Sequence, residues 1–260
     1  LSTASLAALT TTQIVSFNAN QLNALSTAQI ASLETADVAK LGASIVIALS
    51  SGNIAAMTSG QVKALDSVQL QALSSGQIQA LADTQLQALS TAQLNSLEPE
   101  DFALLTTGQI SKLTTEQVSK LSATMLQSLT TGQVANLDDS QVAVLTTAQI
   151  GVLSVEQVGA LNSTQVKSMG TAQLNALNAD QIAALGTEDV AAISATNLSA
   201  LSTAVMQSLT SSQVVNLTNT QLKALDADQL TALDVGDVEG LSTAQINQLT
   251  ANQISTLTTS

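Results

Sequence analysis

The stretch LSTAQLNSLEPEDFALLTTGQISKL, residues 89–113, contains three successive copies of one eight-residue unit, at 90–97, 98–105 and 106–113. Written from Ser2, the same unit aligns 32 times without a gap and ends at Leu257. We call this unit the octad and number its positions one to eight. Pro99, the only proline in the 260 residues, occupies position two of its octad.

Four positions of the octad carry the pattern. Position five is apolar in all 32 octads, position four is Gln in 22, and position one is Ser, Thr, Asn or Asp in 26. Position eight is Leu in 28 octads, with these exceptions: Phe17, Met57, Met169 and Ile193. This regularity predicts a single repeat domain over residues 1–260, without a linker or an inserted catalytic loop. Leu1 and residues 258–260 belong to flanking octads, so we expect a segment of a longer array.

The apolar pair at positions five and eight favours helix over strand. Residues three apart point to opposite faces of a strand but share one face of a helix. A continuous helix fails as well, because eight residues turn it through about 800° and its apolar stripe would drift by roughly 80° per octad. The pattern therefore predicts a helix that stops and restarts in every octad.

Position one carries the signal for the restart. Short polar side chains there can accept a hydrogen bond from the first helical turn, and Gln three residues later completes a capping box. Asp replaces this Gln in four octads and suits the positive end of the helix dipole; these residues are Asp37, Asp101, Asp189 and Asp237. Pro99 then falls on the first helical residue, where its missing N–H has no cost. At positions five to seven a proline would clash with the preceding turn.

Each octad thus predicts one helix of about six residues, near 9 Å long. Isolated helices of that length do not persist in water. Stacked octads can share their apolar faces, as repeats do in a solenoid. The predicted fold is all-α: a solenoid or superhelix of very short helices, one per octad, around a Leu/Ile/Val core. The number of octads in one superhelical turn does not follow from the pattern.

The composition disfavours several functional classes. The net charge is −13, the only cationic side chains are six scattered lysines, and Cys, His, Trp and Tyr are absent. Zinc, haem and triad chemistry therefore lack their usual side chains, and paired carboxylates lie in first helical turns where acids are expected. Binding nucleic acid needs clustered cations, and no run of roughly 18 apolar residues predicts a membrane span. We predict no enzyme, no catalytic, cofactor-binding or metal-binding residues, and no cofactor.

A weaker pattern lies above the octad. Position four is apolar only at Ile45, Met125 and Val205, and each of these residues follows the previous one by ten octads. One interpretation is the duplication of a ten-octad block. The other is that every tenth octad meets a neighbouring molecule, which makes these three residues candidate assembly contacts. The predicted partner is then a second copy of the chain, in a homopolymer or in laterally associated rods.

The units LTTEQVSKL (113–121), LTTAQIGVL (145–153) and LSTAQINQL (241–249) carry a family resemblance. They resemble the L-[ST]-T-x-Q-[IV]-x-x-L octads of very long bacterial surface and secreted proteins of the large repetitive exoprotein or adhesin type. The resemblance covers essentially the whole chain. It implies a location outside the cell or at its surface and a structural or adhesive role.

The leading functional prediction is a structural protein that self-assembles into an extracellular filament, matrix or biofilm component. Repetition without a unique site suits a polymer, because every segment offers the same surface. One alternative is a monomeric adhesin stalk or spacer. An alternative of another class is a solenoid that binds a surface such as polysaccharide or ice, suggested by the regular Thr at positions one and two.

Overall fold

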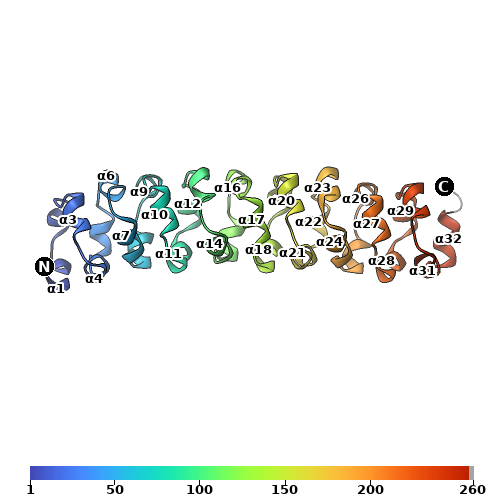
Figure 1. Ribbon diagram of the computed structural model, residues 1–260, viewed down its shortest axis with the longest axis horizontal. Coiled ribbons are helices and arrows are strands. Elements are labelled where there is room, and N and C mark those ends of the chain that lie inside the picture. Colours follow the sequence, from blue (N-terminus) through green and yellow to red (C-terminus); the bar gives the residue numbers. More distant parts are fainter. Residues whose placement is uncertain (258–260) are drawn as a thin grey trace. The chain divides into compact units, whose positions relative to one another are not determined.

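The computed structural model describes residues 1–257. Its contacts divide the chain into two compact units, unit 1 over Leu1–Leu129 and unit 2 over Thr130–Ser260. Both units consist of short helices joined by extended residues (Figure 1), and no strand occurs among the described residues. The octad register in the sequence continues across the boundary, and a single repeat domain over 1–260 stays a prediction.

Unit 1 contains one helix in each of its octads. They are α1 (Thr3–Ala7), α2 (Thr11–Ile14), α3 (Ala19–Asn23), α4 (Thr27–Ala31), α5 (Thr35–Val38), α6 (Ala43–Val46), α7 (Ser51–Ala56), α8 (Ser59–Lys63), α9 (Ser67–Gln71), α10 (Ser75–Gln79), α11 (Asp83–Ala88), α12 (Thr91–Leu94), α13 (Pro99–Phe102), α14 (Thr107–Ser111), α15 (Thr115–Ser119) and α16 (Ala123–Ser128).

Unit 2 follows the same rule over its described residues, which end at 257. Its helices are α17 (Thr131–Ala135), α18 (Asp139–Ala143), α19 (Thr147–Gly151), α20 (Val155–Gly159), α21 (Ser163–Ser168), α22 (Thr171–Leu174), α23 (Ala179–Ala184), α24 (Thr187–Ala192), α25 (Ala195–Leu198), α26 (Thr203–Gln207), α27 (Ser211–Val215), α28 (Asn219–Ala224), α29 (Ala227–Thr231), α30 (Val235–Glu239), α31 (Thr243–Ile246) and α32 (Ala251–Leu257).

The N-terminal caps confirm the predicted restart at position one. Thr114, before α15, is extended with φ −69° and ψ 155°. Its hydroxyl accepts a hydrogen bond from the Gln117 N–H at 3.1 Å, and the Gln117 Oε1 accepts one from the Thr114 N–H at 2.9 Å. This reciprocal pair satisfies two donors that the helix itself leaves unpaired. Pro99 is the first residue of α13, as its position in the octad predicted.

The links between helices need no unusual backbone. No residue in the described range has a positive φ, glycines included. The chain leaves most helices in right-handed or extended geometry, and position one is extended, as at Thr58 with φ −70° and ψ 157°. Ordinary residues can therefore make every turn of the repeat, which explains how the octad repeats without a fixed glycine.

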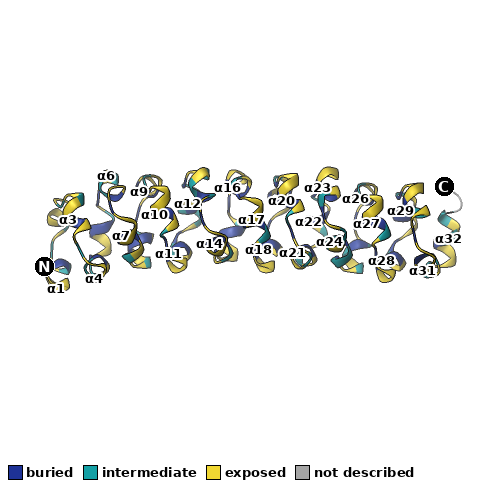
Figure 2. Ribbon diagram, in the orientation of Figure 1, coloured by how far each residue is buried: buried dark blue, intermediate teal, exposed yellow. Residues whose placement is uncertain are grey.

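The core follows positions five and eight. The position-five side chains from Leu6 to Leu230 are buried, and Phe102, the only aromatic among them, is 0 % exposed. Nearly all position-eight side chains in the same range are buried too. Figure 2 shows the buried faces turned inward in both units and the exposed faces on the outer curves of the helices.

Stacking of helices produces the superhelix within each unit. In unit 1, α8 packs against α11 and α4 against α7; in unit 2, α18 packs against α21 and α21 against α24. The labels α20, α23, α26 and α29 accordingly follow one another along one side of unit 2 in Figure 1. Helix n therefore meets helix n+3 in the next turn. The all-α solenoid of short helices, one per octad, is confirmed.

Candidate functional site

The position-four glutamines connect successive turns as well as capping their own helices. Gln165 in α21 is 0 % exposed. Its Oε1 accepts the N–H of its own cap residue, Asn162, at 2.9 Å. Its Nε2 donates to the carbonyl oxygens of Leu137 at 2.7 Å and Val134 at 2.9 Å, which lie 28 and 31 residues earlier. One amide thus satisfies three backbone groups in two turns.

The same geometry recurs along both units, and we call this set of side chains the glutamine ladder. In each, Nε2 donates to a position-eight carbonyl 28 residues earlier, at 2.5–3.0 Å. The members include Gln61, Gln69, Gln77, Gln85, Gln93, Gln109, Gln117, Gln165, Gln173, Gln181, Gln213, Gln221, Gln229, Gln245 and Gln253. Gln29 donates in the same way to the Leu1 carbonyl oxygen.

The ladder fixes the size of a superhelical turn. Each ladder amide bonds to a carbonyl 28 residues earlier, a separation of three and a half octads. That carbonyl belongs to the octad four places earlier. Helices pack three octads apart. One turn therefore takes between three and four octads. The sequence predicted the cap made by Oε1 but gave no sign of the bond made by Nε2, because that bond depends on which octad lies in the preceding turn.

The position-four aspartates find a different partner. Asp37 Oδ1 accepts a hydrogen bond from the Thr11 hydroxyl at 2.6 Å. The pairs Ser75–Asp101, at 3.2 Å, and Ser163–Asp189, at 2.9 Å, repeat this contact. All three hydroxyls lie 26 residues before the aspartate, at position two of the octad three places earlier. A carboxylate cannot donate to the carbonyls that the ladder amides reach, and Asp37 Oδ2 is left buried without a partner.

The three candidate assembly contacts differ in their exposure. Met125 is 2 % exposed and Val205 is 4 % exposed, whereas Ile45 is half-buried. They occupy the place of a ladder glutamine, which faces the interior of the unit. Met125 and Val205 therefore have almost no surface to offer to a second molecule. Their role as assembly contacts stays a prediction, and the burial of Met125 and Val205 weighs against it because position four lies inside the superhelix.

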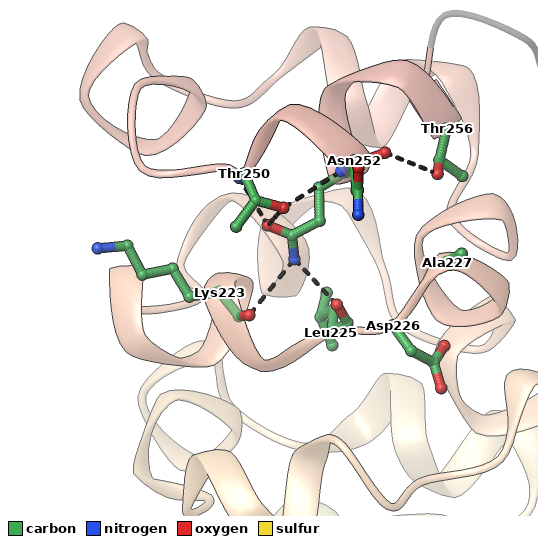
Figure 3. Close-up of a pocket in the computed structure, with 8 residues that line it drawn as sticks. Lys223, Leu225, Asp226, Ala227, Thr250, Asn252 and Thr256 are labelled. Carbon is green, nitrogen blue, oxygen red and sulfur yellow. Dashed lines mark hydrogen bonds between the residues drawn. The ribbon is translucent and has the colours of Figure 1, made fainter.

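The hollows on the surface are formed by the same repeat. A pocket of about 300 Å³ in unit 2 lies beside Lys223, Leu225, Asp226 and Thr250 (Figure 3). Gln253 lines it and donates from Nε2 to the Leu225 carbonyl oxygen at 2.9 Å. The Lys223 ammonium and the Asp226 carboxylate point away from each other in Figure 3. The Gln253 amide thus serves the ladder, and the two charged groups do not converge on a reacting atom.

The charged side chains form no centre of unusual chemistry in the described part of the chain. The pKa of Glu156 is lowered by a hydrogen bond from its own backbone and by one from the Ser154 side chain. Glu156 is fully exposed in a first helical turn, so this shift reflects capping. Residues 1–257 contain no group of three or more acidic, His or Cys side chains placed to hold a metal ion.

The family model for the ALTTAQ repeat matches the chain six times, at residues 1–35, 30–67, 62–99, 94–131, 155–187 and 182–219. These matches cover more than half of the sequence. The chain belongs to the ALTTAQ repeat family. The matches that begin at residues 30, 62 and 94 are spaced four octads apart. A ladder glutamine of this ALTTAQ array also bonds to the octad four places earlier. A search of curated proteins found no match.

Proposed function

We propose that the chain is a structural element at the cell exterior and that it acts as a stalk or spacer. The main support is that the apolar side chains and the ladder amides form their contacts within the chain itself. The aliphatic side chains at positions five and eight are buried within each unit, and the ladder amides bond to the preceding turn. Each octad is stabilised by the turn before it, so the array can be extended without needing a partner.

The outer surface fits this role. The most exposed large apolar side chains within the helices are Val68, at 63 %, and Val235, at 69 %, and they belong to different units. The net charge of −13 adds repulsion between copies. None of the described helices is long and apolar enough to cross a bilayer. The proposed exterior location rests on the resemblance of the octads to those of secreted and surface proteins.

Self-assembly into an extracellular filament, matrix or biofilm component is the second candidate. It is favoured by the repetition of the surface, since positions two and three of most octads are exposed or half-buried in both units. Binding of polysaccharide or ice receives less support. The hydroxyls at position one, such as Thr114 and Thr146, accept bonds from their own helices and do not form a free array.

Electron microscopy and sedimentation of the purified chain test this proposal over a range of protein and salt concentrations. We expect single particles at every concentration. Filaments with a regular repeat would overturn the stalk and support assembly. Val68→Glu and Val235→Glu are the variants for locating a lateral contact in that case. A charge at Met125 or Val205 would disrupt the core of a unit before it reported on assembly, because both side chains are buried.

A further inference from the structure

Octads without Gln at position four lack the Oε1 that usually accepts the N–H of the cap residue. In the octad of Met125, the cap residue is Ser122. The methionine offers no oxygen for the Ser122 N–H and no amide for the preceding turn. This N–H instead donates to the Oδ1 of Asn95, at 2.8 Å. Asn95 lies 27 residues earlier, at position six of the octad four places before.

Asn95 forms a second bond that fixes its orientation. Its Nδ2 donates to the carbonyl oxygen of Lys120 at 2.7 Å. Lys120 lies 25 residues later, in the octad three places ahead. One side chain therefore connects three octads: its own and two neighbouring octads in the next turn. In the ladder, the side chain that links octads n and n+4 belongs to the later octad. Asn95 makes the same link with a side chain of the earlier octad.

The same arrangement occurs at two other places. Asn23 accepts from the Ser50 N–H at 2.7 Å and donates to the Ala48 carbonyl oxygen at 2.8 Å. Asn175 accepts from the Ser202 N–H at 2.8 Å and donates to the Ala200 carbonyl oxygen at 3.3 Å. In both cases the octad served lacks Gln at position four, where it carries Asn53 or Val205.

We propose that Asn23, Asn95 and Asn175 are register clamps, which select the octad that stacks four places later. The octads are so alike that a turn could close one octad early or late with nearly the same core and ladder. A clamp bonds only to groups in the octads three and four places ahead, so it distinguishes the correct neighbour from its near copies. It also supplies an acceptor for the cap N–H where position four is apolar, as at Met125 and Val205.

Some octads without Gln at position four have no clamp. The residue at the clamp position is Val15 for the octad of Ile45 and Lys167 for the octad of Asn197, and neither is an asparagine. The clamp is therefore a local device at three places in the array rather than a necessary companion of every exception.

Transplanting a clamp tests this proposal directly. Gln117→Met removes the acceptor of the Thr114 N–H, and we expect about tenfold faster hydrogen exchange of the Thr114 amide. Gln87→Asn, added to that variant, places an asparagine at the clamp position for Thr114 and should restore the slow exchange. Gln87 already donates to the Lys112 carbonyl oxygen 25 residues ahead, at 2.7 Å. The matched control is Gln79→Asn with Gln117→Met, which sets the clamp one octad too early and should restore nothing.

Removal of a natural clamp provides the converse measurement. Asn95→Ala should raise the exchange rate of the Ser122 amide about tenfold, and Asn95→Ala with Met125→Gln should return it to the parent rate. Asn20→Ala, at an exposed position three, is the control for the loss of an asparagine and should leave Ser122 unchanged. Equal rescue of Thr114 by Gln79→Asn and Gln87→Asn would overturn the proposal. An unchanged Ser122 rate in Asn95→Ala would overturn it as well.

Discussion

Gln165→Glu should destabilise the chain by at least about 3 kcal/mol at neutral pH, although the two side chains have nearly the same shape. The carbonyl oxygens of Leu137 and Val134 accept from the Gln165 Nε2 at 2.7 and 2.9 Å. The introduced carboxylate would face both oxygens and could donate to neither. Position-four aspartates accept a hydrogen bond from a hydroxyl at position two of the octad three places earlier. For Gln165 that position is occupied by Asp139, which has no hydroxyl to donate. Urea or guanidinium unfolding measures the change.

The same variant has a definite pH dependence. Burial and the facing carbonyls raise the pKa of the introduced carboxyl in the folded state above its unfolded value, near 4.3. Protonation of the introduced carboxyl supplies an O–H donor. Its contribution to the free energy of unfolding is therefore fully present below the unfolded-state pKa and is lost as pH rises through the folded-state pKa. The stability gap between variant and parent should therefore narrow on acidification. Gln207→Glu, at an exposed position six, makes the same charge change and should stay within about 0.5 kcal/mol of the parent. Equal effects of the two substitutions would contradict the buried ladder.

Ser111→Pro should cost about 3 kcal/mol or more, whereas Thr107→Pro in the same octad should be nearly neutral or slightly stabilising. Ser111 is the last residue of α14, where a proline ring would clash with the carbonyl one turn earlier. Thr107 is the first residue of that helix, and Thr106 before it is already extended, with φ −67° and ψ 157°. An extended residue is what a following proline requires.

Thermal or denaturant unfolding of the two proline variants compares the last and the first residue of α14. The core residue Ile110, 0 % exposed, precedes position six and would be forced away from helical geometry by Ser111→Pro. Pro99, which begins α13, is the natural example of the tolerated position. If both prolines were tolerated equally, the octad would not contain the helix described here.

Local features of this fold could be predicted from the sequence because they depend on groups within one octad. The spacing of positions five and eight identifies the buried face, and position one marks the helix start. Pro99 confirms the register, since only the first helical residue accepts it without a lost bond. Each of these signals repeats many times, so single exceptions such as Gly42 before α6 do not hide them.

Long-range features could not be predicted in the same way. The donation from Gln165 to Leu137 depends on the pitch of the superhelix, which is set by how side chains of successive turns pack. Met125 and Val205 show the consequence. Both side chains are buried, and the sequence shows only the capping role of position four, not its place inside the superhelix. The pairing of Asn95 with Ser122, 27 residues apart, could be recognised only once that pitch was known.

Ladder amides join the octads that carry them to the octad four places earlier. NMR of the chain with labelled glutamine side chains tests it through Gln165, whose Nε2 lies 2.7 Å from the Leu137 carbonyl oxygen. The amide protons of Gln165 should exchange slowly and show NOEs to Leu137 and Val134, 28 and 31 residues earlier. Rapid exchange of those protons, or NOEs to residues one octad away from this spacing, would contradict the ladder and the superhelix built on it.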